Sequence, residues 1–159
     1  MKQRKSQTIP QGEHIMSADS QLLLGKLYKP TDSDVVYYYD LINANLQLRQ
    51  IISADVLNGV FNAVIHSSAT LDPLIASANT GAPLVEGSFL ATDETADTVY
   101  LIDKPDGTVK KRAISSMAVL EARSFKEAAI MTVPFLLLAG VQDGVDIVNG
   151  VNDDGTPVP

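Results

Sequence analysis

The chain has 159 residues, a length that fits one domain with a sizeable core. Hydrophobic residues make up 45% and charged residues 19%, so the composition is that of a folded protein rather than of a disordered one. The formal charge of −7 disfavours nucleic acid and anionic membranes as partners, and the absence of cysteine excludes disulfides, thiolate metal sites and thiol nucleophiles.

Residues 1–20 are predicted to form an arm. The segment is polar, contains Pro10 and Gly12, and has a basic tip made of Lys2, Arg4 and Lys5. Two interpretations stay open, a flexible solvated terminus or an arm that binds a neighbouring subunit. No apolar run follows the basic residues, so we expect no secretory signal and a cytoplasmic or particle-associated (virion) location.

The next segments combine a short apolar run with two candidate helices. Residues 21–29 are apolar and end before Pro30. Over residues 35–48 the apolar positions fit a helical spacing, but the run VVYYY alternates and has high strand propensity, so helix and strand both stay open. A continuous apolar stripe predicts a helix over residues 53–66, with Ser53 or Asp55 near its start.

The middle of the chain predicts a loop followed by a hairpin. Residues 67–97 are rich in small residues, Pro and Gly, which predicts a long surface excursion with about one helical turn. Residues 98–103 and 108–114 are strand-like and flank the sequence KPDG. Pro105 and Gly107 suit the positions of a tight turn, so we expect a β-hairpin here.

The C-terminal third contains the most apolar stretch, AAIMTVPFLLLAGV at residues 128–141. A helix is predicted from about Met117, ending or kinking near Thr132 because Pro134 follows. The stretch is shorter than the roughly 20 residues that span a membrane, so we expect most of it to be core, with a buried strand or a second helical piece beginning near Phe135. Residues 145–148 predict a strand of a C-terminal hairpin, and residues 151–159 a tail.

No residue pattern predicts catalysis or a cofactor. The phosphate-binding patterns GxxxxGK[ST] and GxGxxG and the nucleophile pattern GxSxG are absent from the sequence. His66, Ser67 and Ser68 with Asp72 have the residue types of a catalytic triad, but triads are assembled from distant loops, so a helix C-terminal role for His66 is favoured. The sequence NGVNDDG lacks the first Asp of a calcium loop, since Gly150 stands there. We therefore predict no catalytic, cofactor-binding or metal-binding residue.

The sequence has one internal basic cluster. On a strand, Lys110 and Arg112 face one side and Lys111 the other. Three uses stay open: protection of a sheet edge, contact with the acidic 50–103 region of a neighbouring copy, or nucleic-acid binding, which the net charge disfavours. The candidate partner-contact residues are therefore Lys2, Arg4, Lys5, Lys110, Lys111 and Arg112.

Together these patterns predict a single α+β domain over residues 21–150, with amphipathic helices packed on a small antiparallel sheet and extended N- and C-terminal arms. The favoured function is a non-enzymatic structural subunit that acts as a homo-oligomer or in a larger particle, a profile typical of a viral or phage virion or capsid-associated component. The alternative is a small ligand- or peptide-binding module that uses the 67–97 region. A hydrolase centred on His66 is the third hypothesis.

Overall fold

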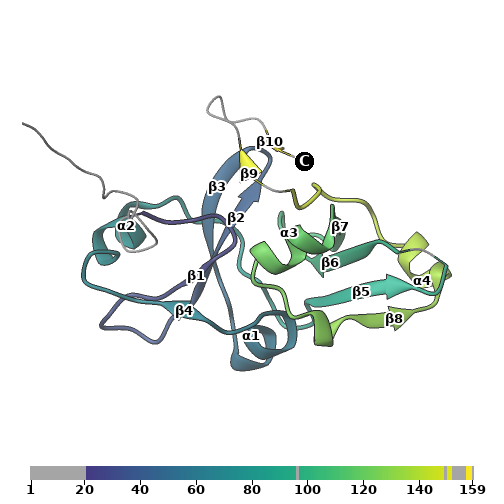
Figure 1. The fold of residues 1–159 in the computed structure, drawn as a ribbon, viewed down its shortest axis with the longest axis horizontal. Coiled ribbons are helices and arrows are strands. Elements are labelled where there is room, and N and C mark those ends of the chain that lie inside the picture. The colour runs from purple at the N-terminus through teal and green to yellow at the C-terminus, as the bar shows by residue number, and fades with distance from the viewer. Residues whose placement is uncertain (1–20, 96, 149, 152–156, 159) are drawn as a thin grey trace, which may run out of the picture.

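The computed structural model describes residues 21–95, 97–148, 150–151 and 157–158, so the predicted arm of residues 1–20 lies outside the described residues. The described residues form two mixed four-stranded sheets and four α-helices, which fits the α+β class. Figure 1 shows the sheets following one another along the long axis, with α2 (Asp72–Ser77) at one end and α4 (Phe135–Ala139) at the other. The prediction of one antiparallel sheet differs from this arrangement, because each sheet contains a parallel pair.

The first sheet has the strand order β3-β2-β1-β4. Its strands are β1 (Leu27–Tyr28), β2 (Tyr37–Ile42), β3 (Asn45–Gln50) and β4 (Ile65–His66). Strands β2 and β3 form an antiparallel hairpin, while β1 pairs antiparallel with β2 and parallel with β4. Of the two alternatives for residues 35–48, strand is therefore confirmed. Asn43 and Ala44 have φ values of 50° and 67°, as the two-residue turn of a twisted hairpin requires.

The second sheet has the strand order β7-β6-β5-β8. Its strands are β5 (Phe89–Asp93), β6 (Val99–Asp103), β7 (Lys110–Ile114) and β8 (Met131–Val133). The predicted hairpin is confirmed, since Val99 lies opposite Ile114 and Gly107 adopts a φ of 89° in the turn. Residues 89–93 were expected to belong to the 67–97 excursion, but they pair with β6 and β8 inside the sheet.

Helix α1 (Ala54–Val60) begins as predicted and ends early. The Ser53 hydroxyl accepts a hydrogen bond from Val56 N, which caps the first turn. The helix was expected to continue to residue 66, but Phe61 is extended and its backbone bridges to Phe125. Pairing with a distant segment therefore ends the helix, although the apolar stripe continues beyond it.

Helix α3 (Met117–Ala122) is also shorter than predicted. The Ser116 hydroxyl accepts from Val119 N at its start, and Ser124 adopts a left-handed φ of 67° just after its end. The chain then forms a 3-10 turn, Glu127–Ala129, and enters β8. The expected helix to Thr132 is therefore wrong.

The main core takes side chains from both sheets and from α1 and α3. At its centre the rings of Tyr38 and Phe61 lie 4.8 Å apart, and those of Phe61 and Phe125 lie 5.5 Å apart. The strand predicted at residues 145–148 is wrong; Ile147 is buried in the core through an isolated bridge to Ile114. The C-terminal pairing lies further along, between β9 (Gly150–Val151) and β10 (Pro157–Val158).

None of the helices formed by the described residues has both the length and the apolar character that a membrane span requires.

Candidate functional site

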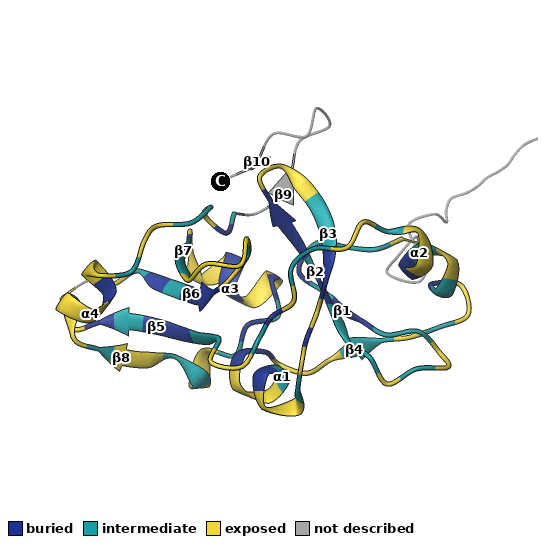
Figure 2. Ribbon diagram, turned by 180° about the vertical axis from the view of Figure 1, so that it is seen from behind, coloured by how far each residue is buried: buried dark blue, intermediate teal, exposed yellow. Residues whose placement is uncertain are grey.

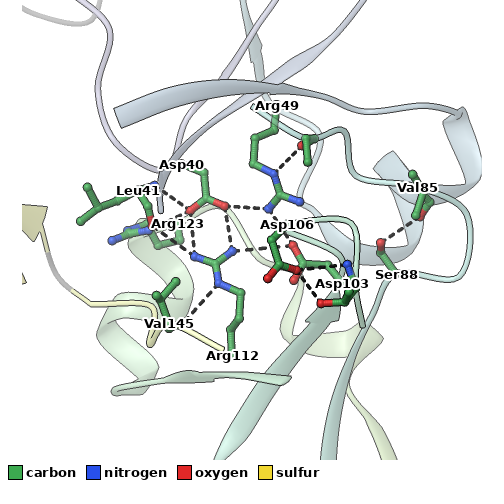
Figure 3. Close-up of polar contacts among 12 residues, drawn as sticks. Asp40, Leu41, Arg49, Val85, Ser88, Asp103, Asp106, Arg112, Arg123 and Val145 are labelled. Carbon is green, nitrogen blue, oxygen red and sulfur yellow. Dashed lines mark hydrogen bonds and ion pairs between the residues drawn. The ribbon is translucent and has the colours of Figure 1, made fainter. Parts of the chain in front are cut away.

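Five charged side chains meet in the interior between the two sheets, and we call them the ionic cluster. Figure 3 shows the guanidinium and carboxylate groups pointing toward one another. They come from β2, β3, β6 and β7 and from the residue that follows α3, and all are buried: Asp40, Arg49, Asp103, Arg112 and Arg123. The cluster thus contains three arginines and two aspartates. Only Arg112 was singled out from the sequence, as a candidate partner-contact residue, and its burial contradicts that prediction among the described residues.

Asp40 is the most fully bonded member of the ionic cluster. Its Oδ2 accepts from Arg49 Nη1 at 2.9 Å and from Arg112 Nη1 at 2.8 Å. Its Oδ1 accepts from Leu41 N at 2.8 Å and from Arg112 Nη2 at 3.2 Å. Burial by itself raises the pKa of Asp40, but the charges and hydrogen bonds of Arg112 and then Arg49 overcome this effect and lower the pKa to about 2.

Asp103 is bonded far less completely. Its Oδ2 accepts from Arg49 Nη1 at 2.6 Å, whereas its buried Oδ1 has no hydrogen-bond partner. Burial therefore outweighs the attraction of Arg112 and Arg49, and the pKa of Asp103 is raised. The two aspartates of the cluster are thus shifted in opposite directions because one is saturated with donors and the other is not.

The ionic cluster holds the two sheets and the C-terminal segment together. Arg112 of β7 bonds Asp40 of β2, and Arg49 of β3 bonds Asp103 of β6, so each pair joins one sheet to the other. Arg112 Nε also donates to Val145 O, and Arg123 Nη2 donates to Val148 O. Because these charged groups are buried, a dissolved substrate cannot reach them, and we interpret the cluster as structural.

The internal basic cluster is divided between the interior and the surface. The Arg112 guanidinium is inside the ionic cluster. Lys111 Nζ donates to Leu138 O at 3.0 Å, in the last turn of α4, and to Val141 O at 2.8 Å, just after the helix. Lys110 Nζ lies 3.9 Å from the Asp106 carboxylate. Partner contact by Lys110 and Lys111 stays a prediction, as it does for Lys2, Arg4 and Lys5, which lie outside the described residues.

The histidine interpreted as a helix C-terminal residue lies in a strand instead. His66 ends β4, and its ring centroid is 5.7 Å from that of Tyr28. The Asp72 carboxylate accepts from Thr31 N and Oγ1, and Ser68 Oγ accepts from Leu71 N. These contacts stabilise the loops around α2, and none of them joins the three residue types of a triad.

Four exposed large apolar side chains that are close together in the sequence form what we call the β8–α4 surface: Met131, Phe135, Leu136 and Leu137. Their exposed fractions are 55%, 49%, 79% and 63%, and Figure 2 shows α4 largely exposed. Of α4 only Leu138 is buried, where it packs against the second sheet. The expectation that most of residues 128–141 is core is therefore wrong. Successive helical residues point about 100° apart, so a five-residue helix on a sheet cannot bury three consecutive side chains.

The connection between β5 and β6 gives the β8–α4 surface an acidic border at Glu94. The Glu94 carboxylate accepts a hydrogen bond from Phe135 N at 3.1 Å, which places it at the start of α4. Asp97 is exposed in the same connection between β5 and β6. Strand β8 is the outer strand of its sheet, and among the described residues it pairs with β5 alone. The site therefore combines apolar side chains, an unpaired strand edge and negative charge.

The sequence contains a signal for the ionic cluster and another for the β8–α4 surface, although neither was recognised. Asp40 and Arg49 each interrupt an apolar, strand-like run, which marks a charge that must be paired inside. The run of Phe135, Leu136 and Leu137 directly after Pro134 signals a short helix with more apolar surface than one face can bury. No family model, curated protein or solved structure matches the chain, so its function is inferred from its own residues.

Proposed function

We propose that this chain is a non-enzymatic structural subunit that acts as a homo-oligomer or as part of a larger particle. The observation that carries the proposal is the β8–α4 surface, where Phe135, Leu136 and Leu137 are exposed side by side on one short helix. Contiguous apolar surface of this kind costs free energy in water and in soluble proteins commonly marks a contact with another molecule. Assembly with other subunits would remove it from water.

The alternative of a ligand-binding module has weaker support. Two of the hollows that described residues form are lined by the 67–97 region. One, lined by Asn45, Gln47 and residues 78–80, has a volume of about 540 Å³ but is a wide-open and mostly polar surface, unlike the apolar cleft of a typical ligand pocket. The other, lined by residues 85–88 together with side chains of β6 and the following hairpin turn, has a volume of only about 190 Å³. Small-molecule pockets usually enclose about 300 Å³ or more. The β8–α4 surface therefore favours an assembly role over a ligand-binding role.

The test is the mass of the full chain in solution, measured by analytical ultracentrifugation at micromolar concentration. We expect a mass above that of the monomer, and a shift toward monomer in the variant Leu136→Glu. Val64→Glu is the matched control, because Val64 is 65% exposed but lies outside the surface, between α1 and β4. A wild-type chain that is monomeric at all micromolar concentrations tested would refute the proposed function.

A further inference from the structure

The β8–α4 surface has features that narrow the identity of its occupant. Its apolar part is Met131, Phe135, Leu136 and Leu137, and the adjoining outer edge of β8 has backbone groups without a neighbouring strand among the described residues. An unpaired edge beside apolar side chains is the arrangement that accepts an added peptide segment. The surface is therefore better suited to a segment of chain than to a flat protein face.

The charge of the β8–α4 surface also limits which kind of segment can bind it. Glu94 lies at the start of α4, and Asp97 is exposed three residues further along the same connection. Lys111 Nζ, a basic group beside the helix, is already bonded to Leu138 O, Val141 O and the Asp143 carboxylate. Contact between two copies of this same surface would bring acidic borders together, which is unfavourable. A segment that is basic at one end and apolar beyond it would instead complement the site.

The chain itself contains one such segment. Residues 1–16, MKQRKSQTIPQGEHIM, carry Lys2, Arg4 and Lys5 near the start, and the apolar residues Ile9, Ile15 and Met16 follow among polar ones. The other basic cluster of the sequence does not compete for this role, because Arg112 is buried in the ionic cluster. Sixteen residues can reach at most about 55 Å when extended, which is ample to cross a subunit boundary.

The position of the β8–α4 surface favours docking of residues 1–16 on a neighbouring copy rather than on their own chain. The described chain begins at Gln21, and Leu22 packs in the cluster that contains Ile75 of α2. Helix α2 and helix α4 lie at opposite ends of the long axis in both views (Figures 1 and 2). The segment thus enters at one end of the molecule, and the surface that complements it lies at the other end.

We propose that residues 1–16 of one copy bind the β8–α4 surface of the next copy, so that subunits assemble head to tail. The basic tip lies against Glu94 and Asp97, and the apolar residues that follow cover Leu136 and Leu137. Such a contact joins two different patches, and it generates a closed ring or an open filament according to the rotation between successive copies. This inference rests on the proposed homo-oligomer and specifies its contact.

The absence of cysteine from the sequence makes a direct test possible. Full chains carrying Ile9→Cys are mixed with full chains carrying Leu136→Cys and treated with a short bismaleimide. The control mixture pairs Ile9→Cys with Val64→Cys, whose side chain replaces one that is 65% exposed. At a bulk concentration of about 10 μM, docking raises the local concentration to the order of 1 mM, so we expect cross-linked dimers to form about a hundredfold faster with Leu136→Cys than with the control.

Charge reversal gives an independent readout. The triple variant Lys2→Glu, Arg4→Glu, Lys5→Glu should weaken assembly roughly tenfold by sedimentation. A triple variant of equal net charge, Lys26→Glu, Lys29→Glu, Lys104→Glu, should leave assembly unchanged. Two results would overturn the docking proposal and leave the proposed function standing. In one, oligomers persist but Ile9→Cys reacts equally with Leu136→Cys and Val64→Cys. In the other, oligomers persist but Leu136→Cys reacts mainly with itself. Monomers throughout would overturn both.

Discussion

Replacing each aspartate of the ionic cluster by asparagine should have very different effects on stability. Asp40→Asn keeps the shape of the side chain but removes the charge that Arg49 and Arg112 bond, and it turns one acceptor into a donor facing their donors. Asp103→Asn removes a charge that burial already disfavours and keeps an oxygen that can accept from Arg49. The two variants are matched in chemistry and in burial.

The structure gives the size of the difference. Lowering the pKa of Asp40 from 3.8 to about 2 stabilises the ionised folded state by roughly 2 kcal/mol at neutral pH. Loss of one partner from a buried ion pair also leaves the other partner uncompensated, so the total cost of Asp40→Asn should be about 3–5 kcal/mol. Asp103→Asn should cost no more than about 1 kcal/mol, the net value of an ordinary hydrogen bond.

Urea unfolding at pH 7, followed by far-UV circular dichroism, measures both values. Wild type and variants must be compared at one protein concentration, because assembly makes the unfolding midpoint depend on concentration. An Asp40→Asn chain that fails to fold agrees with the expected loss, provided that Asp103→Asn folds normally. If Asp103→Asn lowered the free energy of unfolding as much as Asp40→Asn does, the roles assigned to the two carboxylates would be wrong.

Two further predictions concern pH and two glycines. Because the folded pKa of Asp40 is depressed, its contribution to stability is complete above 3.8 and is lost as the pH falls through about 2, which acid titration of the unfolding midpoint can follow. The raised pKa of Asp103 has the opposite sign, so this residue contributes stability that is lost as the pH rises through its folded pKa, and Asp103→Asn should remove that part of the profile. Gly25→Ala should cost more than about 2 kcal/mol, because at a φ of 86° its Cβ would lie 2.5 Å from Arg123 Cδ and 2.8 Å from Arg123 Cα. Gly107→Ala, at a φ of 89° in open space, should cost only about 1–2 kcal/mol, and equal costs in urea would contradict the argument from close contact.

The sequence predicted correctly those elements that depend on residues adjacent in the chain. The hairpin around Gly107 followed from Pro and Gly at turn positions, and the start of α1 followed from Ser53 as a cap. The hairpin of β2 and β3 stayed ambiguous because its turn uses Asn43 and Ala44 without a glycine, although both adopt positive φ. The same lack of a glycine signal at Ser124 made α3 seem longer than it is.

The ionic cluster and the β8–α4 surface depend on distant parts of the chain. Arg112 and Asp40 are 72 residues apart, and Arg49 and Asp103 are 54 residues apart, so no local pattern connects the partners. The exposure of Leu136 and Leu137 depends on which side of α4 the second sheet covers. Apolar content predicted burial for this helix, but burial requires a neighbouring layer, and the described chain provides one on a single side.

The two features are connected by the geometry of the assembly that we propose. The first sheet lies near the point where residues 1–20 join the described chain, and the second sheet carries the β8–α4 surface. The angle between these sheets therefore sets the rotation from one copy to the next, and the ionic cluster is what joins the sheets in the interior. An apolar core of similar volume could be as stable, but directional ion pairs fix orientation more narrowly than dispersion contacts do. In a head-to-tail assembly a small change in that angle would convert a closed ring into an open filament, so the buried charges would act on assembly without contacting another subunit.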